Sequence, residues 1–120
     1  MLHAKLIVLG AAVLLAGCLG PNNRPLQLVS GSGPVYPAAA RAQGIEGYVV
    51  VEYDVTEAGT VANSRVLEAD PAGIFDAAAL AAVSSWVFKP ELIDGQPQER
   101  RRLQSTVSFK LGSGSEYSDY

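Results

Sequence analysis

Strict alternation of side-chain type in two segments is the feature that most constrains how this chain folds. In the segment from Gly47 to Val55, every second residue is apolar, and these residues share one face: Val49, Val51, Tyr53 and Val55. In the segment from Arg101 to Leu111, one face carries Leu103, Ser105, Val107, Phe109 and Leu111. A period of two predicts β-strands that are buried on one face.

A turn, a returning strand and a helix are predicted between these two strands. Gly59 closes the turn after the first strand because it can adopt a positive φ angle. The weak alternation of Thr60–Ala69 predicts a returning strand with a bulge. Ile74–Val87 is predicted to be a helix ended by Pro90, with one apolar face made of Phe75, Ala79, Ala82, Val83 and Trp86. The predicted fold class is α+β: a small three-stranded antiparallel sheet with one helix packed on one face, in the order β-β-α-β.

The N-terminus has the features of an export signal. A short, weakly basic start is followed by an apolar run from Leu6 to Leu19, which at 14 residues is shorter than the roughly 17 that a membrane-spanning helix needs. The run ends in Leu15-Ala16-Gly17-Cys18, which resembles the bacterial lipobox. This resemblance implies cleavage before Cys18 and its lipidation, whereas the alternative is an uncleaved anchor. Leu19 implies, by the usual sorting of such lipoproteins, the outer rather than the inner membrane.

Composition divides the chain into four parts. Residues 1–17 are the predicted signal peptide, and residues 18–33 the lipidated N-terminus with a flexible linker rich in Pro, Asn, Ser and Gly. Residues 34–111 form the predicted domain, and residues 112–120 a flexible polar tail. Fully extended, the linker reaches roughly 50 Å.

The residue inventory excludes most kinds of chemistry. The chain has one His and one Cys, and both belong to the predicted signal or lipidation site. No nucleophile–His arrangement or Cys/His metal site can therefore be assembled. The sequence also contains no phosphate-binding loop motif, and no enzyme activity or cofactor is expected. Asp54 and Glu57 flank the first turn and indicate a solvated hairpin end rather than a catalytic pair. The net charge of −3 disfavours nucleic acid as a partner.

Several short motifs resemble, in order and spacing, the C-terminal domain of the TonB family. They are Pro34-Val35-Tyr36-Pro37, Ile45-Glu46-Gly47, the strand that follows with its turn, Trp86-Val87-Phe88-Lys89-Pro90, and Val107-Ser108-Phe109-Lys110. Structural roles are expected for the residues that carry this signature: Tyr36, Pro37, Gly47, Gly59, Trp86, Phe88 and Pro90.

The resemblance implies a mode of binding and a partner. In this family, the last strand of the sheet is thought to capture the TonB box, an extended segment of an outer-membrane receptor, by strand addition. Carried over, the edge residues are Arg101, Arg102, Gln104, Thr106, Ser108 and Lys110. The implied role is in TonB-dependent transmembrane transport on the periplasmic side of the cell envelope, with an outer-membrane receptor or another envelope protein as partner. Arg100-Arg101-Arg102 serves either as a charged guard against aggregation or as a steering patch, and the same edge could pair two copies into a homodimer.

Three departures from the family leave a second function open. The apolar run contains no Ser or His, the linker is short, and Gly33 stands where the best-known member has a Gln. The alternative function is a membrane-tethered adapter lipoprotein that transduces no energy.

Overall fold

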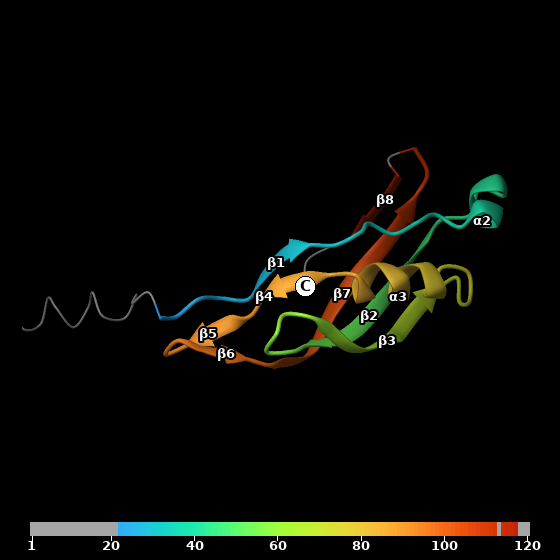
Figure 1. Ribbon diagram of the computed structural model, residues 1–120. Helices are drawn as coiled ribbons and strands as arrows, with labels where there is room; N and C mark the ends of the chain where they lie inside the picture. The colour runs from blue at the N-terminus through green and yellow to red at the C-terminus, as the bar shows by residue number, and fades with distance from the viewer. Residues whose placement is uncertain (1–21, 113, 118–120) are drawn as a thin grey trace, which may run out of the picture.

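A four-stranded antiparallel sheet forms the centre of the fold, in the order β3-β2-β7-β8 (Figure 1). Its strands are β2 (Gly47–Val55), β3 (Val61–Asp70), β7 (Arg100–Lys110) and β8 (Gly114–Tyr117). The structure, a computed structural model, describes residues 22–112 and 114–117. The predicted strand Gly47–Val55 is confirmed and lies between β3 and β7, so its neighbours enclose it on both sides.

One helix, α3 (Asp76–Ser84), covers a single face of this sheet, as predicted (Figure 1). It is shorter than the predicted helix, and Pro90 does not end it. The helix closes at Ser85, and the chain then enters the strand β4 (Val87–Lys89), where the Phe88 amide donates to the Gly59 carbonyl at 2.8 Å. This backbone bond to the first turn draws the predicted last helical turn into an extended conformation.

Short elements that periodicity did not predict surround the central sheet. The helix α2 (Ala38–Ala42) lies at one end of the elongated body, and a hairpin of β5 (Glu91–Ile93) and β6 (Gln96–Gln98) lies at the other (Figure 1). The strand β1 (Gln27–Ser30) pairs with β4 in a separate two-stranded sheet. None of the described helices is long and apolar enough to cross a membrane.

The core lies between α3 and the sheet. The alternating face of β2 is fully buried, and so is the predicted helical face from Phe75 to Trp86. The signature aromatics Tyr36, Trp86 and Phe88 are buried as well. The turn after β2 has the predicted positive φ at Gly59 (88°), and the predicted bulge in β3 is present as register shifts against β2.

Two segments predicted to be flexible take part in sheets. The layout of three strands and one helix is therefore wrong, although the α+β class with antiparallel strands is confirmed. In the predicted tail, Gly114–Tyr117 pairs with β7 as β8, and in the predicted linker, Gln27–Ser30 forms β1. Backbone groups make these pairings, so they need no alternating side chains. Cys18 and the rest of residues 1–21 lie outside the described residues.

Candidate strand-addition edge

The strand β7 has one fully paired edge and one partly paired edge. Along the first, β2 pairs with it from Gly47 opposite Phe109 to Val55 opposite Arg100. Along the second, β8 pairs with it only from Val107 to Lys110. No other described strand lies beside the N-terminal part of this edge, Arg100–Gln104. The N-terminal half of β7 is thus the part of the predicted edge at which a further strand fits.

The two faces of β7 divide as predicted. Ser105, Val107 and Phe109 are buried toward the core, and the Ser105 hydroxyl lies 3.0 Å from the hydroxyl of Tyr53 on β2. Gln104 is exposed, and Thr106 and Ser108 are half-buried on the opposite face. Packing and this buried hydrogen bond hold the strand in place, so it can receive a partner without moving.

The strand β8 covers the C-terminal part of the predicted edge. Ser108 lies opposite Glu116, and Lys110 lies opposite Gly114. Both residues were predicted to contact a bound peptide, but β8 occupies the position that such a peptide requires. The prediction of a continuous edge from Arg101 to Lys110 is therefore wrong for this state of the molecule, because the C-terminal segment folds back on β7.

A bulge marks the N-terminal end of the edge. Between Tyr53 and Val55, β2 has one residue where β7 has two, Arg101 and Arg102. Arg102 adopts a φ angle of 56°, which is uncommon for a residue other than glycine. Its amide donates to the Asp54 carboxylate at 3.0 Å. A bulge of this kind bends the strand and increases its twist.

Asp54 holds a second bulge on the opposite neighbour, β3. Asn63, with a φ angle of 54°, donates from its side chain to the Asp54 carboxylate at 2.9 Å. The bonds from Asn63 and from the Arg102 amide lower the pKa of Asp54, although desolvation opposes them. Asp54 is only 9 % exposed, so the prediction of a solvated hairpin end is wrong for this residue. Asn63 tolerates positive φ, but no sequence signal marks Arg102.

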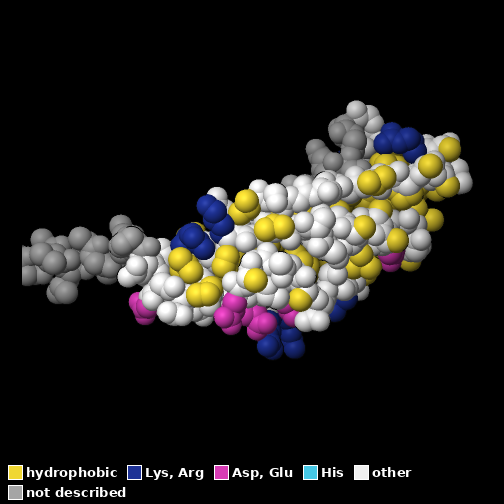
Figure 2. All heavy atoms as spheres, in the orientation of Figure 1, with side chains coloured by type: hydrophobic (Ala, Val, Ile, Leu, Met, Phe, Trp, Pro, Cys, Tyr) yellow, Lys and Arg dark blue, Asp and Glu magenta, His cyan; other side chains and the backbone are white. Residues whose placement is uncertain are grey.

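The three consecutive arginines have different surroundings. Arg101 donates to Glu99 at 2.8 Å, and Arg100 lies 3.5 Å from Glu91. Arg102 is exposed, and among the described residues no carboxylate forms an ion pair with it. Acidic and basic side chains accordingly lie next to one another along the lower border of the face in Figure 2. Arg102 is therefore the arginine of this run that can meet an acidic partner.

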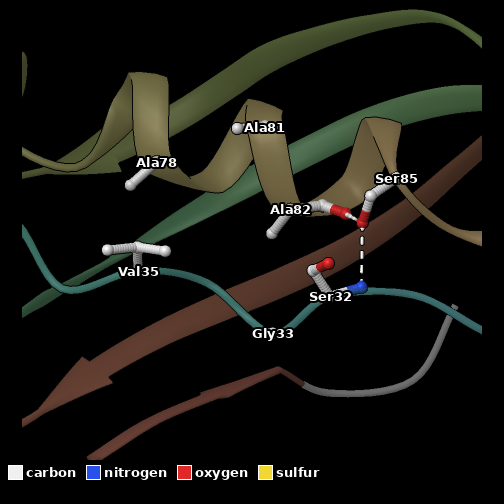
Figure 3. Close-up of a pocket in the computed structure, with 7 residues that line it drawn as sticks. All are labelled: Ser32, Gly33, Val35, Ala78, Ala81, Ala82 and Ser85. Atoms are coloured by element: carbon white, nitrogen blue, oxygen red, sulfur yellow. Dashed lines mark hydrogen bonds between the residues drawn. The ribbon is translucent and has the colours of Figure 1, made fainter.

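A shallow hollow of about 260 Å³ lies elsewhere, between α3 and the segment that follows β1 (Figure 3). The Ser32 amide donates to the Ser85 hydroxyl across it at 3.0 Å. The other lining residues are small or apolar: Gly33, Val35, Ala78, Ala81 and Ala82. No titratable group lines the hollow, and nowhere in the described ranges do three or more His, Cys, Asp or Glu residues gather as metal ligands.

Comparison with known proteins identifies relatives. Residues 32–111 match the family described as Gram-negative bacterial TonB protein C-terminal. Protein TonB of Escherichia coli K12 is 42 % identical over 88 residues, which cover 73 % of this chain and 34 % of the relative. Protein TonB of Pseudomonas aeruginosa is 36 % identical over 101 residues, covering 83 % and 28 %. The solution NMR structure of the Pseudomonas aeruginosa TonB C-terminal domain superposes with a TM-score of 0.64 at 30 % identity, covering 77 % of this chain and 92 % of that one. This chain thus spans about a third of the length of its full-length relatives.

Proposed function

This chain belongs to the Gram-negative bacterial TonB C-terminal family, and on that premise we propose that it binds an extended peptide segment by strand addition at β7. The proposed partner is the TonB box of an outer-membrane receptor, and the proposed role is in TonB-dependent transport on the periplasmic side of the envelope. The observation that carries this proposal is the half-paired edge of β7. Main-chain hydrogen bonds along such an edge supply affinity, and alternate side chains supply selectivity.

Two features of the edge support this proposal. The segment from Arg101 to Gln104 has no described strand beside it, and its exposed Gln104 faces away from the core. The strand that covers the rest, β8, pairs at four positions, whereas β2 pairs with β7 along most of its length. A peptide can therefore add to the N-terminal half first and then replace β8, which lengthens the paired segment.

Titration of the isotope-labelled chain with a synthetic TonB box peptide tests this mechanism. Peptide binding should slow hydrogen exchange at alternate amides of Arg101–Gln104, because successive residues of a strand bond to opposite sides. A chain that ends at Leu111 lacks β8, and it should bind the peptide several-fold more tightly. The strand β3, at the other border of the sheet, serves as the internal control. Exchange changes centred on Val61–Asp70, or weaker binding by the shortened chain, would contradict the proposed site.

We also propose that Cys18 is lipidated and tethers the domain to a membrane. The motif Leu15-Ala16-Gly17-Cys18 supports this proposal. Two or more acyl chains anchor a protein stably, whereas one does not. The intact mass of the natively expressed protein should correspond to a chain that starts at Cys18 and carries acyl groups. The variant Cys18→Ala should remain unprocessed; an unprocessed native chain would rule the anchor out.

The adapter function is the second candidate. The pairing of β1 with β4 favours this function, because the segment Gln27–Ser30 is bound to the domain rather than free to span the periplasm. Both candidates use the β7 edge, and they differ in their need for energy. Receptor-dependent uptake in cells should stop on collapse of the proton gradient if the chain is a transport component. An envelope phenotype of the deletion strain that persists unchanged in the absence of the gradient would favour the adapter.

A further inference from the structure

The segment before α2 is bound along the body of the domain, and we call residues 22–30 the arm. Arg24 and Leu92 exchange backbone hydrogen bonds at 3.1 and 2.8 Å. Farther along the arm, Gln27 lies opposite Lys89 and Ser30 lies opposite Val87. The arm thus adds as a strand to the edge formed by β5 and β4. Leu26 and Leu28 also pack against the core cluster, so side chains reinforce the pairing.

The start of the arm is fixed at the tip of the β5–β6 hairpin. The Gly95 amide donates to the Asn22 carbonyl at 2.7 Å, and the Asp94 amide donates to the Asn23 side chain at 2.8 Å. Asp94 and Gly95 have φ angles of 52° and 79°, which are the values of a tight hairpin turn. The first described residue of the arm, Asn22, is therefore bound directly to the hairpin tip.

The length of chain between the arm and the proposed lipid anchor is short. Cys18 precedes Asn22 by four residues, and four fully extended residues span at most about 14 Å. The acyl chains on Cys18 lie in the membrane, so its backbone lies at the membrane surface. The hairpin tip must then lie within about 14 Å of that surface. The predicted flexible linker would have left this distance open.

The hairpin tip is an end of the molecule, and it has no basic side chain that would attract it to a lipid surface. It stands at the end of the elongated body opposite α2 (Figure 1). Ile93 is 50 % exposed there, and the hairpin from Glu91 to Gln98 carries two acidic residues, Glu91 and Asp94, and no Lys or Arg. Contact with the membrane therefore does not depend on anionic headgroups.

From this geometry we infer that the tip of the β5–β6 hairpin is the membrane-facing surface of the protein, so that the body stands with α2 away from the lipid. The inference rests on the proposed lipidation of Cys18. The hairpin tip thus has a role separate from that of the proposed peptide-binding edge. The tether holds the tip at the membrane and so fixes the orientation in which β7 is presented.

Paramagnetic broadening in lipid nanodiscs tests the orientation. The mature chain, Cys18–Tyr120, has a single cysteine, and this can be coupled to a maleimide lipid in phosphatidylcholine nanodiscs that carry a gadolinium-chelating lipid. Amide signals of Ile93–Gln96 should broaden at least several-fold more than those of Ala38–Ala42. Equal broadening at the two ends, or stronger broadening of α2, would overturn the inference.

Two variants separate the tether from other causes. A 15-residue Gly-Ser insertion between Leu19 and Gly20 can reach ~50 Å. It should abolish the difference in broadening between the two ends. If the difference persists, the tip binds lipid by itself. The tether would then not set the orientation, which overturns the inference. Arg24→Pro removes the amide that donates to Leu92 and should weaken the difference. The lipid in this experiment is attached chemically, so equal broadening at the two ends contradicts the orientation alone. An unlipidated native protein, found by intact mass, contradicts the proposed lipid anchor.

Discussion

At the scale of single residues, the Asp54 carboxylate joins the three central strands. It accepts hydrogen bonds from the Asn63 side chain on β3 and from the Arg102 amide on β7. Both donors sit in bulges with positive φ angles, a conformation that costs free energy in residues other than glycine. One buried charge thus offsets the strain of two bulges and fixes where the β7 edge begins.

Removal of this carboxylate should destabilise the fold in a pH-dependent way. We expect Asp54→Ala to lower the free energy of unfolding at pH 7 by about 2 kcal/mol, because two donors lose a charged acceptor. The pKa of Asp54 is lowered from 3.8 in the folded state, so its contribution is complete above that value and is lost as the pH falls through the folded pKa. Urea denaturation at pH 7 and pH 3 should show a smaller difference between wild type and variant at pH 3. An equal difference at both pH values would show that the charge does not matter.

The strain at Arg102 can be measured with a pair of substitutions. Arg102→Gly keeps the amide that donates to Asp54 and relieves the positive φ, so stability should stay equal or rise by up to about 1 kcal/mol. Arg102→Val places a β-branched side chain in the same conformation and should lower stability by about 1 kcal/mol or more. Both variants lack the guanidinium, so their difference in urea denaturation reports the backbone alone. Equal stabilities would argue against strain at this position.

At the scale of elements, the arm depends on a close approach between Gly31 and Trp86. A Cβ atom at Gly31 would lie 2.3 Å from Trp86 Cδ1, whereas a Cβ at Gly33 would meet nothing within 4 Å. Gly31→Ala should therefore displace the arm at a cost of about 1–3 kcal/mol, and Gly33→Ala is the matched control. Hydrogen exchange at the Leu92 amide should accelerate in Gly31→Ala only, and Trp86 fluorescence should shift to the red. Slow exchange in both variants would mean that the arm tolerates the added methyl group.

The elements that were predicted well from the sequence are those whose side chains are buried in the core on one face. The strands β2 and β7 and the apolar face of α3 were predictable because their side chains must alternate or recur toward the core. The arm and β8 carry no such pattern, because backbone pairing at an edge holds them and side-chain period has little influence there. For the same reason, the strand that covers part of the β7 edge was not predicted.

The end of α3 was mispredicted for a related reason. Helical spacing continues through Trp86, and Pro90 is the next residue that a helix cannot include. The backbone bond between Phe88 and Gly59 decides the outcome. It joins residues far apart in sequence, so no local pattern announces it. The bulge in β7 at Arg101 and Arg102 escaped prediction likewise, because the Asp54 carboxylate that holds it lies on another strand.

At the scale of the whole molecule, the aromatic side chains of the core pack in two groups, one near the arm and one near α2. Trp86 and Phe88 contact Tyr53, with ring centroids 5.7 and 6.2 Å away. Phe75 stacks on Phe109 at 4.3 Å, close to the end where α2 lies. All five belong to one buried cluster, which also contains Tyr36. We therefore expect the described residues to unfold as one unit.

Two probes can check this expectation. Trp86 reports on the half of the core near the arm, and far-UV circular dichroism reports on the sheet as a whole. Their urea transitions should coincide in the wild type, and Phe109→Leu should move both midpoints to lower urea concentration by the same amount. Separate midpoints would indicate that the arm with its hairpin unfolds independently.

The direction in which the arm runs has a mechanical consequence. The arm lies antiparallel to β5 and β4 with Asn22 at the hairpin tip. A force that pulls Asn22 away from the tip while a bound peptide holds β7 is directed along the strands. The backbone bonds of the arm then bear the load together, in shear, instead of opening one after another. If they yield, the nine residues from Asn22 to Ser30, which already span about 30 Å as an extended strand, join the tether without increasing its reach along the pull. The same pairing thus resists a moderate pull, and its loss under a larger one separates the hairpin tip from the tether.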